Sequence, residues 1–192
     1  MHPFRFAAGV LAVVACAGVA HAQATLRGWA TADNQFEASI STSPDAAGDP
    51  WFSGTSWPQT YTGQRDITDP GTYYLQVRAQ DLGRPEMLIG RFTLEGVGAT
   101  FANGTQTLLT NVDDWVVSTA AFGQGTTAPL LIGPNGSSPW GTFPDMQGAS
   151  FIWAPQYEQG IAYFTSSFTV VPSPPAWLVA PIALVVSMRR RR

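Results

Sequence analysis

The chain contains no lysine, and its single cysteine and both histidines lie close to its start, at Cys16, His2 and His21. Everything after position 22 therefore lacks thiol, imidazole and primary amine side chains. That part cannot form a disulfide, a cysteine–histidine zinc site, a serine–histidine–aspartate triad or a lysine Schiff base. Most routes to catalysis are closed, and we expect a protein that is not an enzyme.

Catalysis by carboxylates alone stays open as the remaining enzymatic route. A hydrolase of that kind needs two carboxyl groups placed as acid and base across one bond. Nothing in the spacing of the glutamates selects such a pair; they are Glu37, Glu86, Glu95 and Glu158.

Positive charge is also scarce between positions 23 and 170, where five arginines face thirteen carboxylates, so five minus thirteen gives a net charge of −8. This balance argues against nucleic acid as a partner, because phosphates require a basic patch. It suits a surface protein, or one that binds Ca²⁺ through oxygen atoms. No D-x-D-x-D-G loop is present, so we expect no cofactor and keep Ca²⁺, with Asp113 and Asp114 as contacts, as the alternative.

The first 22 residues have the pattern of a signal peptide. Arg5 supplies the positive charge, Phe6–Val19 form the apolar region, and Ala20 and Ala22 flank His21 as a cleavage site that leaves a mature start near Gln23. Val13–Cys16 also fits a lipoprotein box, in which Cys16 would carry the lipid. Both interpretations predict export.

The last 22 residues combine a proline-rich motif, an apolar run and a basic end. Pro172-Ser173-Pro174 precede an apolar run over Ala176–Met188, and the chain ends in Arg189, Arg190, Arg191 and Arg192. A helix over that run would cover about 20 Å, short of the roughly 30 Å hydrocarbon core. The segment therefore suits transient membrane retention, with the arginines on the cytoplasmic side.

This order of features resembles a PEP-CTERM sorting signal, with Ser173 where the family usually has glutamate. The resemblance implies processing by an exosortase-type membrane protease. The alternative is a plain C-terminal anchor, which places the body of the protein on the same side.

The segment between the two signals has the size of one domain. We divide the chain into a signal peptide (1–22), a β-sandwich domain (23–170) and a PEP-CTERM-like segment (171–192) with a short apolar helix. Gly, Pro, Thr, Ser and aromatic residues are frequent, and no stretch keeps a helical apolar period, so an all-β fold is expected.

Alternating apolar and polar residues locate the strands of this domain. In Thr72–Gln80, Leu75, Val77 and Ala79 are expected to face inward and Gln76 outward; a strand around Leu88–Leu94 is expected to pair with it. Residues 123–146 read as a long loop. Stacking of such sheets predicts an antiparallel β-sandwich. The other expected strands are Ala24–Thr31, Gln35–Thr42, Ser150–Ala154 and Ile161–Val170, with a short extended piece at Thr60–Gly63.

Several stretches resemble the galactose-binding-like jelly roll of glycosidase accessory modules. They are Ala32–Glu37, Trp57, Tyr61, Leu75–Pro85, the aromatic strand Ala149–Trp153, and Tyr163, Phe164 and Phe168. The aromatic strands come last here, which implies a permuted strand order.

Three polar residues at expected strand ends and two tryptophans in expected loops form a candidate sugar-binding set: Asp33, Asn34, Asp81, Trp57 and Trp140. Loop tryptophans can stack on sugar rings while carboxylates and amides hold hydroxyls. The alternatives are turn chemistry for the polar residues and packing over the sandwich edge for the tryptophans. We expect a non-enzymatic protein of the cell surface or extracellular matrix; the alternative is a module that binds carbohydrate of the envelope or exopolysaccharide.

Overall fold

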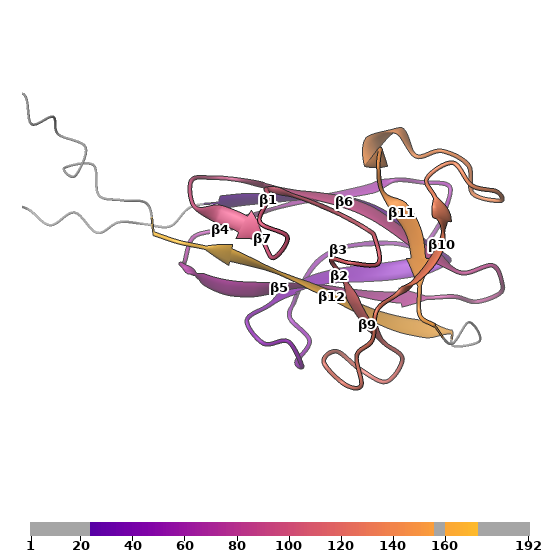
Figure 1. Ribbon diagram of the computed structural model, residues 1–192, viewed down its shortest axis with the longest axis horizontal. Helices are drawn as coiled ribbons and strands as arrows, with labels where there is room; N and C mark the ends of the chain where they lie inside the picture. Colours follow the sequence, from indigo (N-terminus) through magenta and orange to yellow (C-terminus); the bar gives the residue numbers. More distant parts are fainter. Residues whose placement is uncertain (1–23, 156–159, 173–192) are drawn as a thin grey trace, which may run out of the picture. The chain divides into compact units, whose positions relative to one another are not determined.

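The computed structural model describes residues 24–155 and 160–172, which form an all-β structure of two stacked antiparallel sheets (Figure 1). These residues belong to one compact unit, His21–Ser173. The signal peptide with Ala20 and Ala22, and Ser173, Pro174 and Arg189–Arg192 of the sorting segment, lie outside the described residues; Pro172 is described and exposed. Among the described residues, no helix has the length and apolar character needed to cross a membrane.

The first sheet has the strand order β10-β11-β6-β1-β4, with β8 beside β6. Its strands are β1 (Ala24–Asp33), β4 (Tyr61–Ile67), β6 (Met87–Glu95), β8 (Thr107–Leu109), β10 (Leu130–Pro134) and β11 (Ser150–Trp153). A 3-10 turn over Pro144–Met146 precedes β11.

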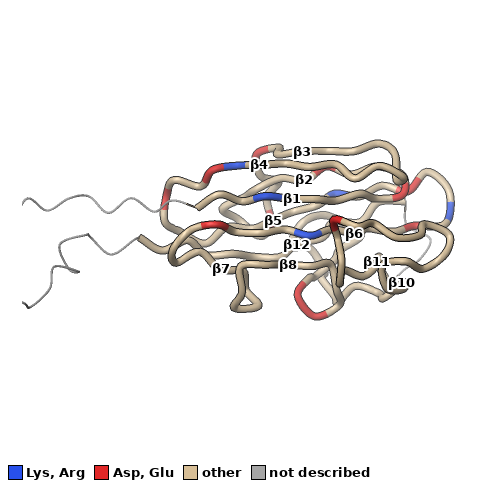
Figure 2. The backbone as a smooth tube through the Cα atoms, turned by 90° about the horizontal axis from the view of Figure 1, so that it is seen from above, with Lys and Arg blue, Asp and Glu red and all other residues tan. Residues whose placement is uncertain are grey.

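The second sheet has the order β3-β2-β5-β12-β7, with β9 also beside β12. Its strands are β2 (Gln35–Ser41), β3 (Asp49–Gly54), β5 (Gly71–Gln80), β7 (Ala99–Phe101), β9 (Val116–Ser118) and β12 (Ile161–Val170). The acidic residues lie mostly in turns and at strand ends, as Figure 2 shows from above. The prediction of two stacked antiparallel sheets, a β-sandwich, is confirmed.

The core lies between the sheets and follows the alternation of the strands. Leu75 and Val77 of β5, Phe164 and Phe168 of β12 and Phe92 of β6 have at most 1% of their surface exposed. Burying a side chain of this size contributes about 1.5–3 kcal/mol, so these inward positions are the main source of stability.

The expected pairing of Thr72–Gln80 with the strand around Leu88–Leu94 is wrong. β5 pairs with β2 and β12, whereas β6 pairs with β1, β8 and β11, so the connection between β5 and β6 crosses from one sheet to the other. Alternation predicts which face a strand buries, but it carries no information about the neighbour in the sheet.

Three further expectations need correction. Residues 123–146 are not loop throughout, because Leu130–Pro134 forms β10 and pairs with β11. The short piece expected at Thr60–Gly63 is the beginning of a longer strand, β4, which starts at Tyr61 and runs to Ile67. Gln76, expected to be exposed, has no exposed surface, because the segment between β2 and β3 covers its outward side chain.

The first and last described strands meet at one end of the sandwich. Thr25 pairs with Glu95 and Val170 pairs with Ala99, and only a short turn separates Glu95 from Ala99. The opposite end contains the end of β1 and the start of β12, where Asp33 pairs with Met87 and Ile161 with Gln80. The two ends are therefore distinct surfaces (Figure 1).

Candidate functional site

Four of the five candidate residues meet at the end of the sandwich that lies away from the first and last described strands. The Asp33 carboxylate accepts the indole N–H of Trp140 (2.9 Å) and the side-chain amide N–H of Asn34 (2.8 Å). The Asn34 side-chain oxygen in turn accepts the backbone N–H of Leu82, and Asp81 caps the N–H of Gly83. The sequence therefore identified residues that the fold brings together.

Asp33 and Trp140 are turned inward, whereas Asn34 and Asp81 are partly exposed. Asp33 is 5% exposed and Trp140 is 7% exposed. Trp140 packs on Phe151 in a small second core, with ring centroids 5.0 Å apart. Trp57 packs on the outside of that core, and its carbonyl accepts the Thr31 hydroxyl. The arrangement closes the end of the sandwich, and the ligand-binding role of the five residues stays a prediction.

Burial also raises the pKa of two carboxyl groups at this end, Asp33 and Glu86. Desolvation raises the pKa of Asp33; the Trp140 hydrogen bond opposes the shift, and the charge of Asp81 adds to it. Desolvation likewise raises the pKa of Glu86, opposed by its own backbone N–H, while the charge of Asp81 adds to the shift. Glu86 is 2% exposed, and its Oε2 atom has no hydrogen-bond partner among the described residues. Of these carboxyl groups, those of Asp33 and Glu86 are buried, and Asp81 is partly exposed.

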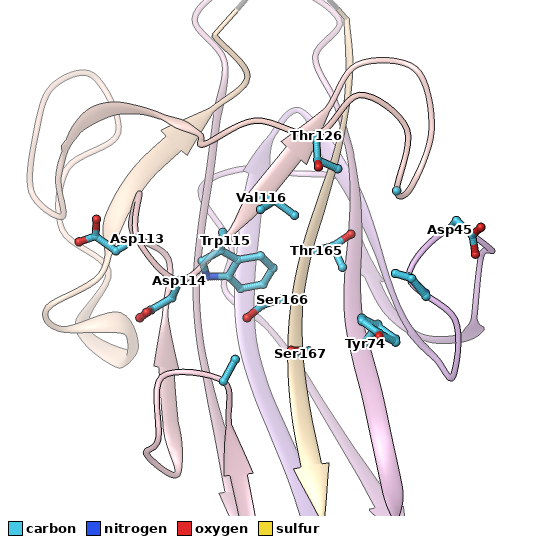
Figure 3. Close-up of a pocket in the computed structure, with 13 residues that line it drawn as sticks. Asp45, Tyr74, Asp113, Asp114, Trp115, Val116, Thr126, Thr165, Ser166 and Ser167 are labelled. Atoms are coloured by element: carbon cyan, nitrogen blue, oxygen red, sulfur yellow. The ribbon is translucent and has the colours of Figure 1, made fainter.

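A cavity of about 460 Å³ lies elsewhere, on the outer face of the second sheet (Figure 3). It lies over the middle of β12, where the strand changes its edge partner: β9 pairs with Tyr163–Thr165 and β7 with Phe168–Val170. The residues that line it are Pro44, Asp45, Tyr74, Ala102, Asp113–Val116, Gly123, Thr126 and Thr165–Ser167.

The floor of this cavity carries a hydroxyl group without a partner. Thr165 is 7% exposed, its side chain lies on the outer face of the sheet beside Gln76, and its hydroxyl oxygen makes no hydrogen bond to a described residue. Ser166, the next residue, pairs with the inward Leu75, so its side chain belongs to the opposite, core-facing side of β12. A buried hydroxyl without a partner costs about 1–3 kcal/mol, so a group that enters the cavity and pairs with one is stabilised. Figure 3 shows both residues on β12, between a wall with Asp113 and Asp114 and a wall with Tyr74 and Asp45.

The first wall is a rigid turn built around Asn111. Its side-chain oxygen accepts the backbone N–H groups of Asp113 (2.8 Å) and Asp114 (2.7 Å), and its amide donates to the Asp114 carboxylate. Next to it, Trp115 donates its indole N–H to the Leu109 carbonyl (3.0 Å), which fixes the ring beside the cavity.

The second wall depends on Gln76, which lies on the outer face of β5. Its side-chain oxygen accepts the Gly48 N–H (3.0 Å), and its amide donates to the carbonyls of Ala46 (3.0 Å) and Ser43 (3.3 Å). These bonds hold the segment that carries Pro44 and Asp45 against the outer face of β5. The cavity is formed before any ligand arrives.

Sequence reasoning singled out Asp113 and Asp114 but missed the floor. The available signal was Thr165-Ser166-Ser167, three consecutive hydroxyl residues inside a strand that otherwise carries aromatic residues. For the Ca²⁺ alternative, the described residues contain no group of three or more acidic, cysteine or histidine side chains arranged to hold a metal ion.

Comparison with known proteins finds no matching family model, no matching curated protein and no matching solved structure.

Proposed function

We propose that the chain is an exported, non-enzymatic β-sandwich protein of the cell surface or extracellular matrix, sorted by its C-terminal segment. The signal pattern over 1–22 and the arginine-ended segment over 171–192 support export and sorting. An exosortase-type membrane protease is the proposed processing partner. Within the β-sandwich class, we propose the galactose-binding-like jelly roll with permuted strand order.

The observation that carries this proposal is the position of the two terminal strands. β1 begins and β12 ends at the same end of the sandwich. A tether that continues from β12 would hold the domain by that end and leave the opposite end and the cavity face accessible. This geometry is compatible with display of the domain on a surface.

The test is intact mass and cell fractionation of the full chain in the organism that encodes it. We expect a mature species that starts near Gln23 and ends close to Pro172–Pro174. A membrane-bound species that still carries Arg192 would remove the exosortase from the proposal and leave a plain anchor. A cytoplasmic species that retains residues 1–22 would overturn export altogether.

A matched pair of variants tests the sorting segment itself. Replacing Arg189–Arg192 by glutamine removes the charge that holds this end in the cytoplasm, so sorting should fail while the protein still folds. Replacing the same four residues by lysine keeps the charge and should preserve membrane retention. Normal sorting of the glutamine variant would contradict the proposal.

Carbohydrate binding is the second candidate function, and one observation favours it. The cavity over β12 combines the unpaired hydroxyl of Thr165, carboxylates and the ring of Tyr74 at a volume of about 460 Å³, within the range of small-molecule sites. The net charge of −8 between positions 23 and 170 supports a ligand other than nucleic acid.

A further inference from the structure

We propose that the cavity over Thr165–Ser167 binds an amino sugar, in which a protonated amine accompanies the ring hydroxyls. The proposal rests on the carbohydrate-binding function above and adds the location of the site and the class of sugar. It departs from the candidate set Asp33, Asn34, Trp57, Asp81 and Trp140, of which Asp33 and Trp140 are buried and bonded to each other.

The hydroxyl of the floor determines the polar character of the ligand. Thr165 is more than nine-tenths buried, lies on the outer face of β12, and its hydroxyl lacks a partner among the described residues. This hydroxyl can donate one hydrogen bond and accept others. Sugar hydroxyls are donors and acceptors at once, so one of them can satisfy it in either role.

The charge of the walls determines the sign of the charge that the ligand carries. Asp113 and Asp114 lie on one side of the cavity and Asp45 on the other (Figure 3), and none of the described residues lining it is a lysine or an arginine. Carboxylates repel uronic acids, sulfated sugars and phosphates, and they bind an ammonium group through charge-assisted hydrogen bonds. The acidic surroundings also favour the approach of a cation.

Tyr74 supplies the apolar contact that a sugar ring needs. It lies half-buried on the second wall (Figure 3), whereas Trp115, between the floor and the first wall, is 2% exposed and packs on Phe92 in the core. The Trp115 indole N–H is also bonded to the Leu109 carbonyl, so this side chain shapes the cavity without offering a face to the ligand. The C–H face of a pyranose ring can pack on the Tyr74 ring while the sugar hydroxyls reach β12.

The test compares three oligosaccharides of equal length by calorimetric titration of the mature protein near pH 6. They are a glucosamine oligomer, the N-acetylglucosamine oligomer and a glucuronate-containing oligomer. We expect the glucosamine oligomer to bind roughly tenfold more tightly than its acetylated form, as expected when one neutral hydrogen bond becomes charge-assisted. Its affinity should fall with added salt, and the glucuronate oligomer should not bind.

Variants locate the site. Asp113→Asn and Asp45→Asn should reduce the preference for the amine, whereas Asp145→Asn, which removes an exposed carboxylate outside the cavity lining, should leave it unchanged. Thr165→Val keeps the shape and removes the hydroxyl, so it should weaken binding of both glucosamine oligomers. Since it also removes an unpaired buried hydroxyl, the fold should tolerate it.

The outcomes separate the two levels of the proposal. Equal or tighter binding of the acetylated oligomer would overturn the amino-sugar assignment and leave carbohydrate binding in place. Unchanged binding in Thr165→Val would overturn the location. Absence of binding by all three oligomers would overturn both, while the export proposal, tested by intact mass, would stand.

Discussion

The indole N–H of Trp140 donates to the carboxylate of Asp33 over 2.9 Å, and the two residues are 107 positions apart in the sequence. The bond ties the segment before the 3-10 turn to the last residue of β1. Asn135 holds the same segment from within, donating to the carbonyls of Phe143 (2.8 Å) and Met146 (3.0 Å). One end of the sandwich is therefore closed by buried polar contacts as well as by apolar packing.

Replacing Trp140 by phenylalanine should destabilise the protein by about 1–3 kcal/mol, because the buried Asp33 oxygen loses its donor. Urea unfolding measures this change. Trp57→Phe is the control: it makes the same chemical change in a half-buried tryptophan whose indole makes no hydrogen bond within the described residues. Equal losses in both variants would show that ring size, and not the hydrogen bond, is responsible.

The raised pKa of Asp33 predicts a pH dependence with a definite sign. Below the ordinary pKa of 3.8, the carboxyl is protonated in the folded and the unfolded chain, and its contribution to stability is complete. As the pH rises through the higher pKa of the folded state, only the folded chain still holds the proton, and this contribution is lost. Desolvation is the main cause of the shift.

Asp33→Asn should therefore remove one source of this loss. The stability of wild type minus that of the variant should fall as the pH rises above 3.8 and then level off. Unfolding curves at a series of pH values measure the difference. Asp145→Asn, at an exposed position, is the control for the change in net charge. A difference that grows with pH would contradict the direction of the shift.

Gln76 attaches the second wall of the cavity to β5, and Gln76→Met should remove this attachment. The substitution leaves the Gly48 N–H without its acceptor, at a cost of about 1–3 kcal/mol if the group stays buried, and removes one of the two donors of the Ala46 carbonyl, which keeps the Ser41 hydroxyl. Sugar binding at the cavity should weaken as the wall that carries Pro44 and Asp45 loosens.

Chemical unfolding and the calorimetric titration measure the two effects of Gln76→Met separately. Gln80→Met, on the same strand and the same face, is the matched control, because Gln80 is only half buried and its side chain contacts Gln35 and Arg78. Similar effects of the two substitutions would mean that Gln76 does not position the wall.

The sequence predicted local features of this fold well and its tertiary features poorly, for a physical reason. Leu75, Val77 and Ala79 alternate with polar residues, so their burial could be inferred. The burial of the outward Gln76 could not be inferred in this way, because the segment from Ser43 to Gly48 that covers it is distant in the sequence.

For the candidate sites, too, local features could be predicted from the sequence and tertiary features could not. Asp33, Asn34 and Asp81 were found because each follows or precedes a strand, and strand ends from both sheets gather at one end of a sandwich. Trp140 was found as a loop tryptophan, but its burial depends on Phe151 and Asp33, which are distant partners. The cavity depends on where β12 changes its neighbour from β9 to β7, and strand neighbours are not encoded in local alternation.

Gly123 lies against Asp45 of the second wall of the cavity. Its φ of +71° belongs to the left-handed region, and a Cβ atom there would lie 2.7 Å from the Cβ and 2.8 Å from the Cα of Asp45. Gly123→Ala should therefore combine the cost of the backbone conformation with a clash against the second wall. We expect a loss of about 1–3 kcal/mol and weaker sugar binding.

Gly125→Ala separates these two contributions. Gly125 lies in the same loop with a φ of +57°, and a Cβ atom there meets nothing within 4 Å, so this variant carries the backbone cost without the clash. It should lose only about 1 kcal/mol and bind as the wild type does. If the two alanine variants lose equal stability and equal affinity, the contact between Gly123 and Asp45 does not shape the cavity. A larger loss in Gly123→Ala, by thermal unfolding and by titration, would show that the wall is held by the approach of these two loops.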